Sequence, residues 1–139
     1  MLQSLRINRE RLGSKAKIAI DAKLLRALLQ ALVANAPFSE AFYTATYPDI
    51  AQAHVSGRIP DLHKHFIEAG FFEGRMGASP DVDETFYTTT YRDVGEAVQN
   101  GSVPSGQEHY LRSGAAEGRV PNPDTQTVID TWMQALNPT

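Results

Sequence analysis

Apolar residues between positions 18 and 33 recur at the three- and four-residue spacing of a helix with one apolar face. At 100° per residue the leucines fall within one half-turn of the helix, and Lys23, Arg26 and Gln30 lie opposite. The pattern predicts an amphipathic helix over Ile18–Val33 whose apolar face needs a core or a partner. We take five residues of this face as candidates for docking a partner: Leu24, Leu25, Leu28, Leu29 and Leu32.

A second helical pattern closes the chain. Pro123 and Asp124 are typical of a helix start, because proline fits the first helical position and an acidic residue suits the first turn. Apolar residues then follow at helical spacing, which predicts a C-terminal helix. They are Val128, Ile129, Trp132, Met133 and Leu136.

Between these two patterns the chain repeats itself with an offset of 44 residues. Without any gap, 15 of the 38 positions from Phe38 to Arg75 are identical to their counterparts. The repeat ends in the same Gly-x-x-Glu-Gly-Arg motif, at Gly70–Arg75 and again at Gly114–Arg119. A period this regular predicts a duplicated supersecondary unit.

Each copy of the repeat contains start and stop residues for three short helices. Short polar side chains accept the free N–H groups of a first helical turn, and glycine tolerates the left-handed conformation that often follows a helix. The predicted N-caps are Ser39 and Asp49 in the first copy and Asp83 and Asp93 in the second, and the third helix is predicted to begin near Asp61 or Ser105. The predicted stops are Gly57 and Gly70, then Gly101 and Gly114.

The sequence therefore predicts an all-α protein. Two tandem three-helix repeats pack together, flanked by a longer N-terminal amphipathic helix and a C-terminal helix that clasp them. Its predicted parts are residues 1–37 (basic arm and amphipathic helix), 38–80 (repeat 1), 81–123 (repeat 2) and 124–139 (C-terminal helix), in one compact domain.

Charge is distributed unevenly along the 139 residues. Residues 1–36 hold seven basic and two acidic side chains, whereas the rest holds six basic and fourteen acidic ones. Such an arm suits a nucleic acid, an anionic membrane or an acidic protein surface. It lacks interleaved aromatic residues, so we expect no specific nucleic-acid binding. Arg26 and Gln30 interrupt the leucine run, so we expect neither a signal peptide nor a transmembrane segment, and the localisation stays open.

The sequence shows no catalytic constellation. It has no cysteine, no phosphate-binding loop and no nucleophile elbow. The close pair His63 and His65 points to different sides of a helix, so we expect no metal there. We predict a non-enzymatic protein without a metal or a cofactor.

Tyrosine, histidine and arginine recur at equivalent positions of the two copies. Aromatic faces can stack on sugar rings or bases, and the charged groups can bind polar ligands. Core packing with internal hydrogen bonds is the favoured alternative for the tyrosines and histidines, and the arginines can instead span their own turn. The candidate ligand-binding residues are Tyr43, Tyr47, His65, Arg75, Tyr87, Tyr91, His109 and Arg119.

These motifs resemble a known bacterial module. The stretches FYTATYPDIA…HKHFIEAGFFEGRMGASP and FYTTTYRDVG…EHYLRSGAAEGRVPNP are similar to a tandem module of about 40 residues. That module begins Y-L-x-x-N-P-D-V-A and ends H-Y-x-x-x-G-x-x-E-G-R-x-P. Threonine and tyrosine replace its leucine and asparagine here. The module occurs beside polysaccharide glycosyltransferases and in surface or secreted proteins, so the resemblance implies a non-catalytic role near cell-surface glycans.

Two functions follow as hypotheses. The first is a non-enzymatic binding module associated with bacterial surface polysaccharide, with two similar weak sites acting through avidity. The second is a structural adaptor subunit of a larger envelope-associated or particle-like assembly, docking through the N-terminal helix and compatible with an oligomer. The first requires the repeated side chains to be exposed in a groove. The second requires them to be buried or internally bonded and the leucine face to be uncovered.

Overall fold

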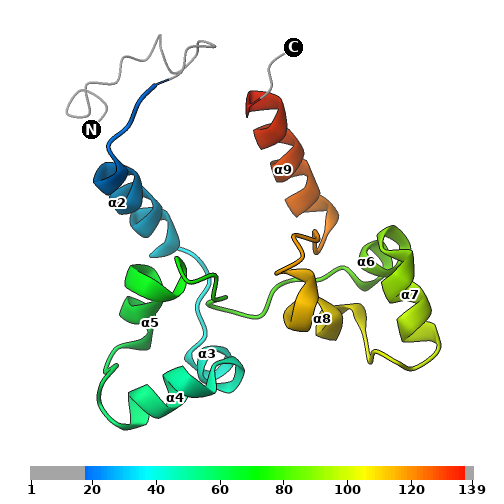
Figure 1. Ribbon diagram of the computed structural model, residues 1–139, viewed down its shortest axis with the longest axis horizontal. Coiled ribbons are helices and arrows are strands. Elements are labelled where there is room, and N and C mark those ends of the chain that lie inside the picture. Colours follow the sequence, from blue (N-terminus) through cyan, green and yellow to red (C-terminus); the bar gives the residue numbers. More distant parts are fainter. Residues whose placement is uncertain (1–17, 137–139) are drawn as a thin grey trace.

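The computed structural model describes residues 18–136. These residues form helices joined by turns, with no strand among them, which confirms the predicted all-α class. Five of the seven basic residues of the predicted arm lie in residues 1–17, outside the described part. The α-helices and two π-helical turns (η1, η2) are α2 (Ala22–Val33), α3 (Glu40–Thr46), α4 (Pro48–Val55), α5 (Leu62–His65), η1 (Phe66–Gly70), α6 (Glu84–Thr90), α7 (Arg92–Gln99), α8 (Gly106–His109), η2 (Tyr110–Gly114) and α9 (Pro123–Leu136) (Figure 1).

Elements 44 residues apart have matching bounds, from α3 and α6 through η1 and η2. The match includes a backbone hydrogen bond that joins the start of each set of three helices to the chain that follows the set. Ser39 N donates to Gly77 O at 2.8 Å, and Asp83 N donates to Pro121 O at 3.1 Å. We call residues 38–80 the first segment and residues 81–123 the second segment.

The first and third helices of each segment begin where polar caps accept backbone N–H groups. The Ser39 hydroxyl accepts from Phe42 N at 3.2 Å, and the Asp83 carboxylate accepts from Phe86 N at 2.8 Å. These bonds satisfy donors that an α-helix leaves free at its start. Asp61 and Ser105, near which the third helix was predicted to begin, cap it in the same way.

The predicted caps of the second helix were wrong. Tyr47 and Tyr91 stand at the N-cap positions of α4 and α7 and make no side-chain cap bond. Pro48 begins α4, where its missing N–H is not needed. Asp49 and Asp93 lie one position inside the helices, and their carboxylates bind arginines of the repeated motif instead.

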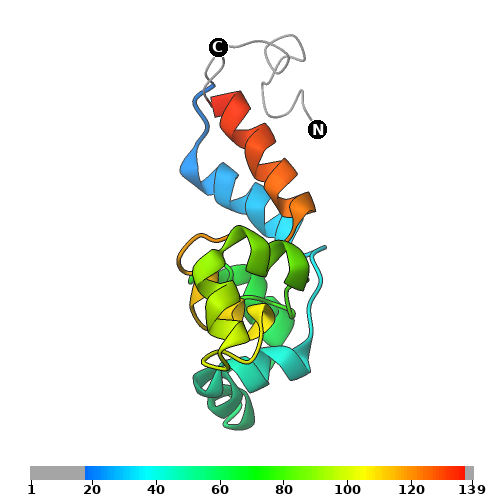
Figure 2. The same ribbon diagram turned by 90° about the vertical axis from the view of Figure 1, so that its right-hand side faces the viewer.

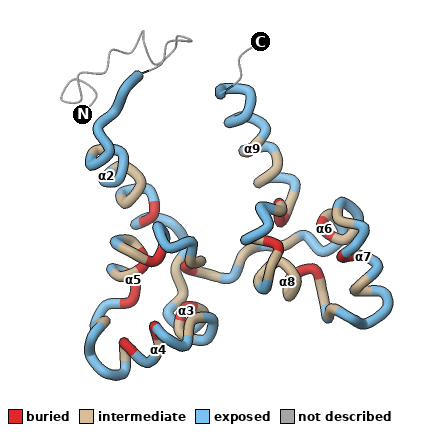
Figure 3. Tube along the Cα trace, viewed as in Figure 1, coloured by how far each residue is buried: buried red, intermediate tan, exposed pale blue. Residues whose placement is uncertain are grey.

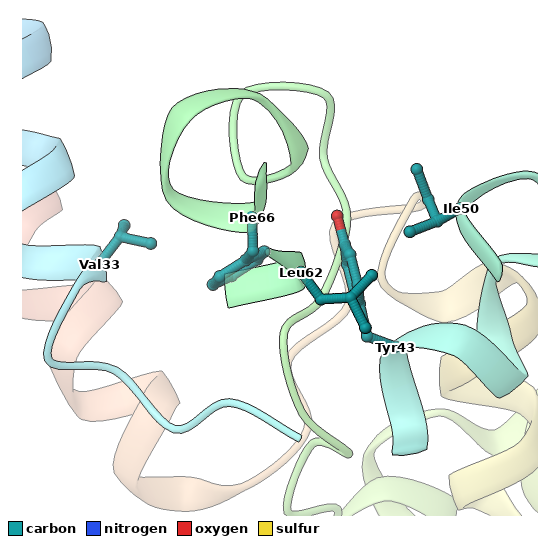
Figure 4. Packing of buried hydrophobic residues seen from close by; sticks show 5 residues of the cluster. All are labelled: Val33, Tyr43, Ile50, Leu62 and Phe66. Atoms are coloured by element: carbon teal, nitrogen blue, oxygen red, sulfur yellow. The ribbon is translucent and has the colours of Figure 1, made fainter. Parts of the chain in front are cut away.

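The buried core of the first segment combines residues of α2, α3, α4, α5 and η1. Figure 4 shows how these side chains converge: Val33, Tyr43, Ile50, Leu62 and Phe66. Phe38, Tyr47, Ile59 and Ile67 pack against this cluster. Burial of this apolar and aromatic surface is the main favourable term for the segment.

The second segment has buried residues of its own. Tyr87, Val94 and Val120 are buried there, and no residue of the second segment belongs to the core cluster of the first. Figure 3 shows the two sets of buried residues apart. A groove of about 490 Å³, lined by Phe66 of the first segment and Tyr110 of the second among others, lies between them.

The two flanking helices differ in how they meet the segments. α2 begins at Ala22, later than the predicted Ile18, because Asp21 caps it by accepting from Lys23 N at 2.8 Å. α2 buries Val33 and packs against η1. α9 has no buried residue and projects from the rest of the chain (Figures 1 and 2). The expectation that both flanking helices clasp the repeats is therefore wrong for α9.

Candidate functional site

The repeated tyrosine and histidine of the first segment bind each other. Tyr43 on α3 is fully buried, and its hydroxyl lies 3.1 Å from Nδ1 of His65 on α5. Burial raises the pKa of Tyr43 to about 12, so the phenol stays neutral at physiological pH. His65 is half-buried. The pair therefore ties α3 to α5 inside the segment.

Arg75 of the repeated motif binds three groups of the first segment. Its two terminal nitrogens donate to the Asp49 carboxylate at 3.2 and 2.8 Å, and its Nε donates to Glu73 at 2.9 Å. The guanidinium also lies over the Tyr47 ring, 4.9 Å from the centroid. The hydrogen bond from Arg75 lowers the pKa of Asp49. We call this arrangement the arginine clamp.

The Tyr47 hydroxyl completes the clamp by accepting from the backbone N–H of Met76 at 2.8 Å. The clamp thus fixes the chain that leaves η1 against the junction between α3 and α4. Bidentate pairing of a planar guanidinium with a carboxylate adds orientation as well as attraction.

The second segment repeats the same set of contacts. The Tyr87 hydroxyl lies 3.1 Å from His109 Nδ1, and Arg119 donates to Asp93 at 2.9 and 2.7 Å and to Glu117 at 2.6 Å. The Tyr91 hydroxyl accepts from Val120 N at 2.7 Å. The hydrogen bond from Arg119 lowers the pKa of Asp93 to about 2, and burial raises the pKa of Tyr87 to about 12.

The two glycines of each motif have different physical roles. Gly74 and Gly118 have φ of 79° and 72°, in the left-handed region that glycine adopts without a Cβ clash. Gly70 and Gly114 end the π-helical turns, and a Cβ at either would collide with the hydroxyl of the buried tyrosine. The predicted stop at Gly70 is correct in place, but its reason is close packing against Tyr43.

These contacts decide where the eight candidate ligand-binding residues lie. Within each segment the structure brings the four together. The tyrosines bind histidine and backbone, and the arginines bind carboxylates of their own segment. The arginine side chains are only 21% and 20% exposed for Arg75 and Arg119. The arrangement holds helices and turns together, and any ligand would have to compete with these internal bonds.

Sequence reasoning missed one hydroxyl beside His109. Ser113 Oγ lies 3.3 Å from His109 Nε2 and 3.4 Å from the His109 carbonyl oxygen. The spacing of four residues on one helical face was the available signal. With the Tyr87 hydroxyl on Nδ1, the imidazole is held by hydrogen bonds on both nitrogens. Ala69 stands at the equivalent position of the first segment.

The leucine face of α2 is partly uncovered. Leu25 is 45% exposed and Leu32 is 71% exposed, while Leu24, Leu28 and Leu29 are half-buried. Leu25 and Leu29 line a shallow apolar groove of about 410 Å³ together with Phe72. Two of the five predicted docking residues, Leu25 and Leu32, therefore present apolar surface to solvent.

Arg26 forms one wall of this groove. Its guanidinium lies over the Phe72 ring, 4.1 Å from the centroid, and donates to the Glu68 carbonyl oxygen at 2.6 Å. These contacts fasten α2 to the end of η1. The groove is therefore held in place by the same residues that anchor the helix.

Comparison with models of known families, with curated proteins and with solved structures gives no match for this chain. Within residues 18–136, no three histidine, aspartate or glutamate side chains gather closely enough to hold a metal ion. In the same range, no helix has both the length and the hydropathy that crossing a bilayer requires.

Proposed function

We propose that this protein is a non-enzymatic structural adaptor, one subunit of a larger assembly, that docks through α2. The observation that carries the proposal is a contrast in exposure. The repeated tyrosine, histidine and arginine groups are bonded internally, whereas Leu25 and Leu32 of α2 face solvent. Exposed apolar residues gathered on one helix face are typical of a surface that binds another protein.

We further propose that the two segments are tandem copies of one three-helix unit that serves as a rigid spacer. The equivalent helix bounds, closing bonds and arginine clamps support this interpretation. In this role the Gly-x-x-Glu-Gly-Arg motif closes each unit. The function of the spacer is then to keep docking surfaces at a fixed separation.

Association with bacterial surface polysaccharide is the second proposal, and it rests mainly on the resemblance of the motif. One observation favours it: a polar groove of about 510 Å³ on α6 and α7, lined by Glu84, Thr88, Arg92 and Glu96 among others. Hydroxyl and charged groups of this kind suit sugar hydroxyls. Binding of the full chain to a polysaccharide array, lost in Arg92→Ala with Glu96→Ala, would support this proposal.

The adaptor proposal is tested by site-specific photo-cross-linking in cells. A benzophenone amino acid replaces Leu32 in one variant and Val55, which is 88% exposed on α4, in the matched control. We expect a discrete cross-linked product from position 32 and none from position 55. Equal, diffuse labelling at both positions, or no product at position 32, contradicts docking through α2.

A further inference from the structure

The C-terminal helix α9 presents an apolar face that is mostly exposed in the described part of the chain. Trp132 is 63% exposed and Met133 is 53% exposed, and Val128 and Leu136 are exposed on the same side. A helix of 14 residues is marginal by itself in water, and most helices in proteins are stabilised by packing an amphipathic face. α9 therefore needs a surface to pack against.

The charges of α9 and α2 are complementary. α9 contains Asp124 and Asp130 and no basic residue, whereas α2 contains Lys23 and Arg26 and no acidic residue. Both helices are amphipathic with an uncovered apolar face. A helix with the properties of α9 is therefore a suitable occupant of the apolar face of α2.

The placement of the two helices suits a pairing between two copies of the chain. α2 runs toward the first segment and α9 runs away from the second, and both lie at the same end of the molecule (Figures 1 and 2). The two helices run in nearly opposite directions. A two-fold axis that runs along them, beside the chain, therefore lays α9 of a second copy antiparallel to α2 of the first, and the same contact forms again in the reciprocal sense.

We propose that the protein forms a two-fold homodimer in which α9 of each copy packs on the leucine face of α2 of the other. The proposal rests on the adaptor function and identifies the partner at α2 as a second copy of this chain. Trp132 and Met133 lie against Leu25 and Leu29, and the acidic side chains of α9 face Lys23 and Arg26, which line the same groove. The dimer would carry four repeat segments on one central layer of helices.

The first test is the mass of the purified full chain in solution, measured by light scattering over a dilution series. The expected mass is twice the 15.3 kDa of one chain. Trp132 is the single tryptophan of the chain and reports on the same contact. Its emission is expected to shift to longer wavelength on dilution, in step with the fall in mass.

Variants on the two helices test the contact itself. Leu25→Glu and Met133→Glu each place a charge in the proposed interface, and each is expected to raise the dimer dissociation constant by about thirtyfold or more. Val55→Glu, an exposed apolar residue far along α4, is the matched control and should leave the mass unchanged. Circular dichroism checks that all three variants remain folded.

Charge reversal tests the pairing of α2 with α9. Lys23→Glu alone and Asp130→Lys alone should each weaken the dimer, and the two together should restore association toward that of the parent chain. A double variant that is as weak as the sum of the single effects overturns the pairing of these two helices.

The outcomes separate this inference from the adaptor proposal. A monomer at the highest concentration, with tryptophan emission that does not depend on dilution, overturns the homodimer. The adaptor proposal survives that result if Leu32 still cross-links to another protein in cells. A ladder of masses above the dimer overturns the closed two-fold arrangement, because it indicates open head-to-tail contacts.

Discussion

The first and second segments have the same polar frame and different apolar interiors. Both contain the buried tyrosine bonded to histidine and the arginine clamp, with distances that agree closely. Leu62, buried in the first segment, corresponds to Gly106 in the second. There the Glu84 carboxylate accepts from the N–H groups of Gly106 and Gln107.

The difference extends to the surface over the π-helical turns. Phe66, Phe71 and Phe72 of the first segment correspond to Tyr110, Ala115 and Ala116 of the second. The phenylalanines meet α2, through Arg26 over Phe72 and through the cluster that contains Val33. The tyrosine, histidine, arginine and glycine positions therefore maintain the helix arrangement, while the apolar positions vary with what covers each segment.

The largest expected difference between the segments is in their aromatic cores. Phe66→Ala should lower the free energy of unfolding by about 3–4 kcal/mol, because it opens a cavity in the core cluster of the first segment. Tyr110→Ala, at the equivalent but half-buried position, should cost about half as much. Urea unfolding measures both, and equal losses would contradict the difference in packing.

The motif glycines should behave alike in the two segments. Gly70→Ala and Gly114→Ala should each cost about 2–3 kcal/mol, because the added Cβ collides with the tyrosine hydroxyl. Gly57→Ala is the control, since a Cβ there meets open space and only the left-handed backbone opposes it. That variant should lose about 1 kcal/mol. A cost at Gly70 no larger than at Gly57 is the contradictory result.

Glu84 should stabilise the second segment, whereas its counterpart Glu40 should contribute little to the stability of the first. Glu84→Gln weakens the charge-assisted bonds to the start of α8 and should cost about 1 kcal/mol. Glu40→Gln, at the equivalent exposed position of the first segment, should change the urea midpoint little. If both substitutions have the same effect, Glu84 does not compensate for the missing leucine.

The stability of the fold at low pH should depend on the carboxylates of the two arginine clamps. The pKa of Asp93 is about 2 in the folded protein and near the ordinary value of 3.8 in the unfolded chain. The clamp therefore stabilises the fold fully above pH 3.8. That contribution is lost as the pH falls through the folded value, because protonation must then break the pair. Asp49 shifts in the same direction. Thermal melts between pH 2 and pH 6 should show a smaller fall for Asp93→Asn, and an identical profile would be the contrary outcome.

Much of the helix arrangement was predictable from local signals. The 44-residue offset and the polar caps Ser39, Asp61 and Asp83 placed the helices correctly, because caps act within one turn. Asp49 was misassigned as a cap because its partner, Arg75, lies 26 positions away in sequence, and composition does not reveal such a pairing. The sequence also did not predict which aromatic side chains are buried. Tyr43 and Tyr47 share a helix face, yet only Tyr43 is fully buried.

The central claim is that the repeated arginines hold the fold and do not recognise a ligand. The decisive measurement is urea unfolding of Arg75→Met/Arg119→Met beside the parent chain, with both also applied to a polysaccharide array. We predict a loss of about 2 kcal/mol in the free energy of unfolding, since two partly exposed clamps are removed. An unchanged unfolding midpoint together with lost polysaccharide binding would contradict the account and make the clamps recognition elements.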